Sequence, residues 1–179
     1  MANRNTNVKN PMSQPSTDSS PALAAVECRL NGKDATLRVP GHWTLADALR
    51  ETALLTGLHL GCEHGVCGAC TVLLDGEPVR SCLMLAVQAS GRELRTVEGL
   101  AQPDGALSAL QRAFKEHHAV QCGFCTSGLL MTATALLERC RDLDEVEIRA
   151  ELAGNLCRCT GYEGIVAAVL AAAASSRRS

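Results

Sequence analysis

The sequence predicts an α+β protein in which a strand-rich half is followed by an all-helical half. Between about residues 25 and 97, apolar residues alternate with polar ones in short runs that are separated by turn pairs. From about Gly99 onward, apolar residues recur instead at the three- and four-residue spacing of amphipathic helices. Because runs of strands precede runs of helices, we expect two domains with a boundary near residues 99–103.

The first half predicts two β-hairpins, a helix between them and a last short strand. Asn31-Gly32 and Asp75-Gly76 supply two-residue turns. Thr44 is a suitable N-cap for the helix, and apolar residues follow it at helical spacing. The Gly- and Cys-rich run of residues 61–70 predicts a loop. The expected elements are a hairpin at 25–39, a helix at 44–57, a hairpin at 71–83 and a strand at 93–97.

The second half predicts four helices. The first is expected to place Leu107, Leu110 and Phe114 on one face. Asp144 with Glu147 three residues later has the pattern of a capping box, which predicts the start of the third. The expected helices span about residues 107–118, 126–140, 144–152 and 161–174.

Composition limits the classes of function. The chain has 179 residues, 46% of them hydrophobic and 20% charged, and a net charge of −2, which gives no reason to expect nucleic acid or an anionic membrane surface as a partner. No run approaches the roughly 20 apolar residues of a membrane-spanning helix. Residues 1–22, rich in Asn, Ser, Thr and Pro, predict a disordered tail, with a transit peptide as the weaker alternative. The expected compartment is the cytoplasm, where thiols stay reduced.

Ten cysteines are too many for such a chain without a purpose, and the first group of them has a specific spacing. A C-x4-C-x2-C run followed by a distant fourth cysteine is the pattern of plant-type [2Fe–2S] sites. Gly61, Gly65 and Gly68 allow loop N–H groups to point at the cluster sulfurs. Zinc is the alternative, but it usually takes two paired knuckles. His64 is expected to be a loop residue, because a Rieske site needs two histidines. The group consists of Cys62, Cys67, Cys70 and Cys82.

A second group of four cysteines lies in the helical half, and its spacing is less specific. One pair precedes the second expected helix, whose N-terminus favours anionic thiolates. Zinc, a catalytic dithiol or a disulfide would each suit such a group, although Cys157-x-Cys159 is an awkward zinc knuckle. Cys28 and Cys140 remain, and we expect them to be small core hydrophobes or plain thiols. The second group consists of Cys122, Cys125, Cys157 and Cys159.

Taken together, these residues resemble the small iron–sulfur subunit of the molybdenum hydroxylases, the xanthine oxidase family. The sequence departs from the family pattern at Ser127, where Pro is common; Pro suits a first helical turn, so its absence does not affect ligation. The resembling stretches are residues 61–76 with Ser81-Cys82, the run Gln-Cys-Gly-Phe-Cys-Thr at 121–126, and the run Gly-Asn-Leu-Cys-Arg-Cys-Thr-Gly-Tyr at 154–162.

The resemblance implies a β-grasp, plant-type ferredoxin-like domain over residues 23–99 and a four-helix [2Fe–2S]-binding domain over 100–179, with each group of four cysteines holding one [2Fe–2S] cluster. It also implies that Gln121 hydrogen-bonds the pterin of a molybdenum cofactor. This chain has no room for molybdenum or flavin domains, so the molybdenum–pterin cofactor and FAD are expected on partner subunits, and no residue here is expected to be catalytic.

The expected function is electron transfer from the molybdenum cofactor through the helical-domain cluster and the ferredoxin-like cluster to FAD, or to a cytochrome. The expected assembly is a heterotrimer or a dimer of heterotrimers, formed with a large molybdopterin-binding subunit and a medium FAD-binding subunit. Two alternatives come from other classes of function. One is a free-standing ferredoxin-like carrier that serves several partners, which would need only the first domain. The other is a zinc-stabilised interaction module.

Overall fold

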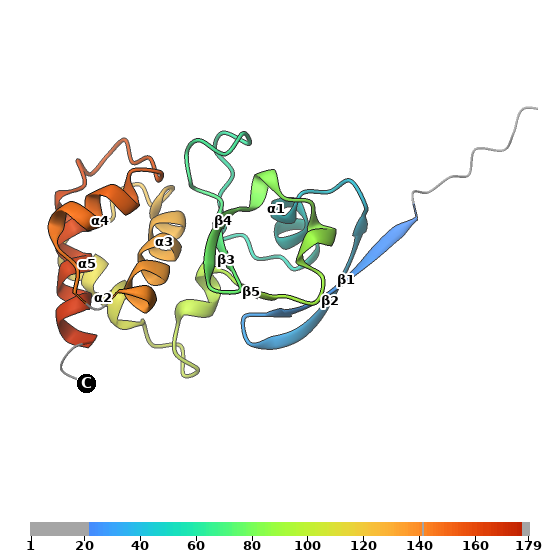
Figure 1. The fold of residues 1–179 in the computed structure, drawn as a ribbon, viewed down its shortest axis with the longest axis horizontal. Helices are drawn as coiled ribbons and strands as arrows, with labels where there is room; N and C mark the ends of the chain where they lie inside the picture. The colour runs from blue at the N-terminus through green and yellow to red at the C-terminus, as the bar shows by residue number, and fades with distance from the viewer. Residues whose placement is uncertain (1–21, 141, 177–179) are drawn as a thin grey trace, which may run out of the picture.

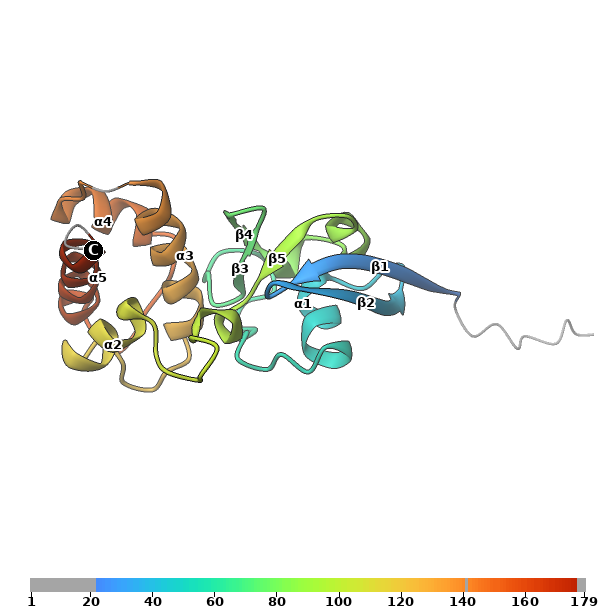
Figure 2. The ribbon, with the colours of Figure 1, turned by 90° about the horizontal axis from the view of Figure 1, so that it is seen from below.

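The computed structural model describes residues 22–140 and 142–176. The tail expected over residues 1–22 lies, except for its last residue, outside the described residues. Figures 1 and 2 show a sheet-containing half and a helical half side by side along the longest axis of the molecule. The α+β class that the sequence predicts is therefore confirmed.

A five-stranded mixed sheet forms the first half, with strand order β2-β1-β5-β3-β4. β1 pairs with β5 in parallel, and the other neighbours are antiparallel. The two predicted turn pairs join β1 to β2 and β3 to β4, because Asn31 and Asp75 take left-handed φ values of 50° and 51° and each is followed by a glycine. The strands are β1 (Leu23–Leu30), β2 (Lys33–Pro40), β3 (Thr71–Leu74), β4 (Glu77–Arg80) and β5 (Glu93–Arg95).

The helix expected at 44–57 is wrong in length. Thr44 caps it as predicted, since its hydroxyl accepts the N–H of Asp47 at 3.1 Å, but only Leu45–Asp47 (α1) is α-helical. The chain widens into a π-helical turn, η1 (Ala48–Thr52), and Leu54 then takes a left-handed φ of 56°, which ends the helix. The second strand of the hairpin expected at 71–83 also ends early, at Arg80. The 3-10 turns, which the sequence pattern did not reveal, are η2 (Ser81–Leu83), η3 (Ala86–Ala89) and η4 (Val97–Leu100).

All four predicted helices are present in the second half. Asp144 accepts the N–H of Glu147 at 2.8 Å, which confirms the capping box. The prediction that Leu107 lies on the buried face of the first of these helices is wrong. Leu107 precedes the cap residue Ser108, so it lies outside the helix, and it is 41% exposed. No helix in the described ranges is long and apolar enough to cross a membrane. The helices are α2 (Ala109–Glu116), α3 (Thr126–Arg139), α4 (Glu145–Leu152) and α5 (Glu163–Ser176).

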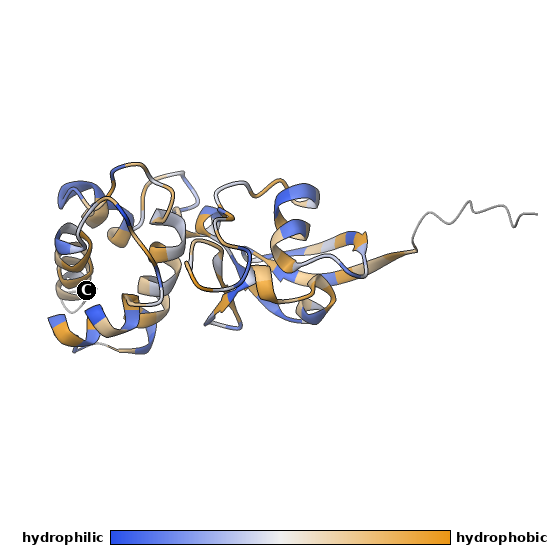
Figure 3. Cartoon of the chain, turned by 90° about the horizontal axis from the view of Figure 1, so that it is seen from above, coloured by the Kyte–Doolittle hydropathy of each residue, from blue (hydrophilic) through white to orange (hydrophobic). Residues whose placement is uncertain are grey.

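Each half has its own hydrophobic core, and β3 contributes to both. Val72 and Leu74 pack into the sheet core, whereas Leu73 packs into the helical core, because successive side chains of a strand point to opposite faces. β3 is therefore buried on both faces, with α3 of the helical half against it. The β1–β2 hairpin has one buried face only, and Figure 3 shows both hydrophobic and hydrophilic residues along it.

Candidate iron–sulfur centres

Pairing of β3 with β4 brings the first group of cysteines together. Cys62 and Cys67 lie in the loop before β3, and Cys70 directly precedes this strand. Cys82 lies in the turn that follows β4. The antiparallel register sets these strand ends side by side, and Ser81 donates its N–H (3.3 Å) and its hydroxyl (2.7 Å) to the carbonyl of Cys70. The fourth cysteine thus reaches the loop as the spacing predicts.

The thiols of this first group fall into two pairs. The N–H of Cys67 donates to Cys62 Sγ at 3.3 Å, and with backbone groups of His64 it lowers the pKa of Cys62 to about 6. Such N–H groups stabilise a thiolate, the form that binds iron. In the other pair, burial and the neighbouring Cys70 thiol raise the pKa of Cys82 to about 11. His64 is exposed, with Nδ1 against the carbonyl of Cys62, in agreement with its assignment as a loop residue.

The second group is also paired, but across the helical half. Cys125 is the N-cap residue of α3, and Cys157 and Cys159 lie in the loop between α4 and α5. Sγ of Cys122 lies 3.6 Å from Sγ of Cys159. Burial and the adjacent Cys157 thiol raise the pKa of Cys125 to about 12. Burial acts to raise the pKa of Cys157 as well, but hydrogen bonds from Thr160 lower it overall.

This paired arrangement suits a two-iron cluster better than a single ion. A zinc ion needs four ligands around one point. A [2Fe–2S] cluster instead takes two thiolates on each of two irons, so two separated pairs per site match its requirement. The donor set of both groups therefore fits the cluster.

Gln121 lies exposed beside Cys122. The neighbouring Phe124 is anchored from the sheet half. Its ring stacks on His59 with centroids 4.9 Å apart, and its carbonyl contacts Nδ1 of His59 at 2.9 Å. The segment around Cys122 is thus attached to both halves of the molecule.

Sequence reasoning assigned no role to Asn155, which the structure buries between the two groups of cysteines. Its side chain is 1% exposed and bonds both halves of the molecule. The only sequence signal is its place within the run 154–162, where a polar residue stands between Gly154 and Leu156.

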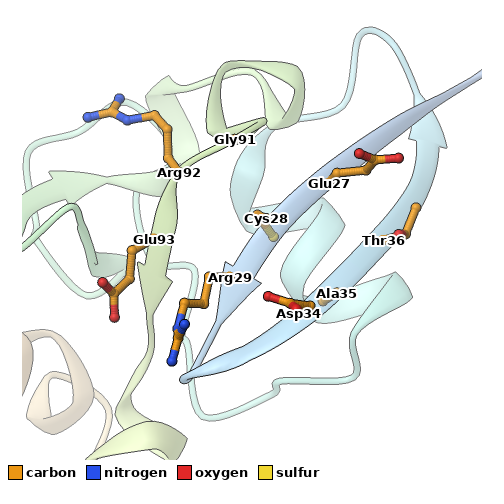
Figure 4. Close-up of a pocket in the computed structure, with 9 residues that line it drawn as sticks. All are labelled: Glu27, Cys28, Arg29, Asp34, Ala35, Thr36, Gly91, Arg92 and Glu93. Carbon is orange, nitrogen blue, oxygen red and sulfur yellow. The ribbon is translucent and has the colours of Figure 1, made fainter.

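The two remaining cysteines lie apart from both groups. Cys140 is the half-buried C-cap residue of α3. Cys28 is buried in β1, where burial raises the pKa of its thiol. Cys28 is among the residues that line an open hollow of about 590 Å³ over β1, β2 and β5. Figure 4 shows charged side chains of both signs around it, such as Arg29 and Glu93. A protonated, buried thiol agrees with the expectation of a plain core cysteine.

Comparison with known proteins finds one match in each half of the chain. A family model for a 2Fe-2S iron-sulfur cluster binding domain matches residues 28–101, and a model for a [2Fe-2S] binding domain matches residues 96–170. The fold and the two groups of cysteines therefore define a two-cluster iron–sulfur protein, with a ferredoxin-like first half and a helical second half.

Individual relatives define the family more closely. The small subunit of nicotine 6-hydroxylase from Paenarthrobacter nicotinovorans is 59% identical over 81% of this chain and 87% of its own. The xanthine dehydrogenase iron-sulfur-binding subunit of Escherichia coli O157:H7 is 51% identical over 81% of this chain and 91% of its own. In the crystal structure of quinoline 2-oxidoreductase from Pseudomonas putida 86, one chain superimposes with a TM-score of 0.84 at 51% identity, covering 88% of this chain and 98% of that one.

The chain belongs to the family of small iron–sulfur subunits of the molybdenum hydroxylases. Its role is that of an electron-transfer subunit within a multi-subunit oxidoreductase.

Proposed function

We propose that this chain binds one [2Fe–2S] cluster in each half, through two pairs of thiolates per cluster. The observation that carries the proposal is the pairing itself. In each group, the four thiols lie as two close pairs, as two irons require. The proposed ligands are Cys62, Cys67, Cys70 and Cys82 for the first cluster, and Cys122, Cys125, Cys157 and Cys159 for the second.

When bound, the clusters would supply one-electron redox chemistry in both halves of the chain. The chain's own residues set the environment of this chemistry. N–H groups such as that of Cys67 stabilise negative charge on sulfur, whereas burial raises the pKa of the Cys82 and Cys125 thiols. The domains of this proposal are residues 23–99 and 100–179. The presence of two hydrophobic cores supports this division, although Leu73 of β3 packs into the helical core.

The proposed partners are a large subunit that carries the molybdenum–pterin cofactor and a medium subunit that carries FAD, in the cytoplasm. Gln121 is the proposed contact to the pterin, because it is exposed and adjacent to the ligand Cys122. The helical half then faces the molybdenum subunit, and the ferredoxin-like half faces the flavin subunit. A cytochrome could take the place of the flavin subunit, and the assembly could be a heterotrimer or a dimer of heterotrimers. Either difference would change the assembly but not the role of this chain.

Metal analysis and EPR test the cluster proposal. Anaerobically purified protein is expected to contain about four irons and four inorganic sulfides per chain. Cys67→Ser should remove one set of reduced-state EPR signals and Cys122→Ser the other, while the matched control Cys140→Ser should remove neither. Zinc in place of iron, or loss of both sets of signals after a single ligand substitution, would refute the assignment.

Partner capture tests the placement in a complex. The chain should co-purify with larger chains that carry molybdenum and flavin, whereas isolation as a single brown protein would favour the free-carrier alternative. Gln121→Ala is expected to keep both clusters but to slow their reduction by substrate in the assembled complex. Unchanged turnover would count against a pterin contact at this residue.

A further inference from the structure

The loop before β3 and the loop between α4 and α5, which carry proposed ligands of the first and second cluster, touch through their backbones. The N–H of Leu156 donates to the carbonyl of Cys67 at 2.8 Å. Cys67 is a proposed ligand of the first cluster, and Leu156 directly precedes Cys157, a proposed ligand of the second. One hydrogen bond therefore completes an otherwise covalent route between ligands of the two sites.

Asn155 sets the geometry of this contact through its side chain. Its Nδ2 donates to the carbonyl of Gly68 at 2.9 Å and lies 3.3 Å from the hydroxyl of Thr71. Its Oδ1 accepts the hydroxyl of Thr132 on α3 at 2.9 Å. The amide thus joins the residue after Cys67 to the helical half, and it is fully enclosed and hydrogen-bonded at both ends.

The backbone of Asn155 is also held by hydrogen bonds, so the N–H of the next residue, Leu156, has little freedom to move. Its own N–H donates to the carbonyl of Leu152 at 2.9 Å, and its carbonyl accepts the hydroxyl of Tyr162 at 2.9 Å. The close approach of the loops also depends on Gly68, which has a φ of +74° and where a Cβ would lie 2.5 Å from the carbonyl of Gly154. The register of Leu156 against Cys67 is therefore determined from both sides.

We propose that Asn155 is a positioning residue, which holds the N–H of Leu156 on the carbonyl of Cys67 so that this contact couples the two iron–sulfur sites electronically. The proposal rests on the proposed function. The exchange moves one electron from the reduced site of one half to the oxidised site of the other, with no bond formed or broken and no proton transferred. Electronic coupling falls steeply across a gap, so a dry hydrogen-bonded contact is a better connection than separated loops.

Other contacts hold the halves together without touching this route. Arg95 on β5 pairs with Glu138 on α3 at 2.6 Å. Arg80 donates to the carbonyl of Gly154 at 2.7 Å, and His59 stacks on Phe124. Loss of the Asn155 side chain should therefore loosen the contact without separating the halves, and a variant at Arg95 supplies a matched control that weakens the interface elsewhere.

The test is the rate of electron exchange between the sites in the assembled complex, followed by rapid-freeze EPR after a single reducing pulse. Asn155→Ala is expected to slow the exchange by about tenfold, a factor that corresponds to about 1.4 kcal/mol. The magnetic splitting between the two fully reduced centres should shrink, while iron content and the g values of each centre remain. Arg95→Gln should leave both rate and splitting unchanged.

Normal rate and splitting in Asn155→Ala, with only a lower unfolding temperature, would overturn the proposal and leave a structural role. If this variant does not retain iron, Thr132→Val takes its place, because it removes one of the amide's partners and should slow the exchange to a smaller extent. An unchanged rate in Thr132→Val would then overturn the proposal. Parent protein without iron and sulfide would instead refute the proposed function, so the two failures are distinguishable.

Discussion

The hydroxyl of Tyr162 is the contact whose removal we develop in most detail. It accepts the N–H of Cys157 at 2.7 Å and donates to the carbonyl of Asn155 at 2.9 Å, so a single oxygen clamps the loop before α5. Tyr162 itself has a left-handed φ of 68°, which is unfavourable for an aromatic residue. Tyr162→Phe removes this oxygen and leaves the ring in place.

The expected cost follows from the two lost hydrogen bonds. Each contributes a net of about 0.5–1.5 kcal/mol, so the free energy of unfolding should fall by about 2 kcal/mol. For a chain of this length, that loss corresponds to a decrease of roughly 4–8 °C in the unfolding temperature. Since the released loop carries two proposed ligands, Cys157 and Cys159, iron should also leave the second site faster.

Thermal unfolding of the iron-loaded protein measures the first effect, and iron release to a chelator measures the second. Thr134→Val is the matched control, because it removes one hydroxyl that donates to the carbonyl of Leu130 at 2.7 Å, within α3 and away from the ligand loop. The control should cost about 1 kcal/mol or less and leave iron release unchanged. The reasoning fails if Tyr162→Phe unfolds within about 1 °C of the parent and releases iron at the same rate.

Three further substitutions test the packing around the sites. Gly128→Ala puts a Cβ against the carbonyl of Gly68 in the first cysteine loop, so the free energy of unfolding measured in urea should fall by about 2 kcal/mol. The control Gly41→Ala meets no atom within 4 Å, and its free energy of unfolding should stay within about 1 kcal/mol of the parent value. Equal values for the two variants would contradict the close approach at Gly128. Ser127→Ala removes a buried hydroxyl that has no hydrogen-bond partner among the described residues, and should raise the unfolding free energy by about 1 kcal/mol; a decrease would show that the hydroxyl has a partner in the loaded protein. His59→Ala removes the ring stacked on Phe124 at a cost of about 1 kcal/mol and should speed iron release from the second site in a chelator assay, and an unchanged rate would argue against this anchor.

Local signals in the sequence predicted most of the fold. The turns at Asn31-Gly32 and Asp75-Gly76, the cap at Thr44 and the capping box at Asp144 are decided by residues within four positions of one another, and the structure has all of them. The errors occur where packing overrides such signals. The helix expected to continue to residue 57 ends in a π-helical turn, and Leu107 lies outside α2 although its spacing suits the helix.

The sequence by itself determined the spacing of the cysteines, and the C-x4-C-x2-C run predicted the first group as a set because this spacing is a property of a cluster-binding loop. The second group was predicted as a cluster site through the resemblance to a family, because its own spacing suits other sites as well. Only the tertiary structure decided how they pair. Cys122 meets Cys159 across 37 positions, and Asn155 reaches Gly68 across 87. β3 is likewise buried on both faces only because α3 packs on it. Contacts of this kind depend on how the two hydrophobic cores fit against each other. The sequence does not reveal this fit, because periodicity along the chain shows only which face of an element is buried and not what covers that face.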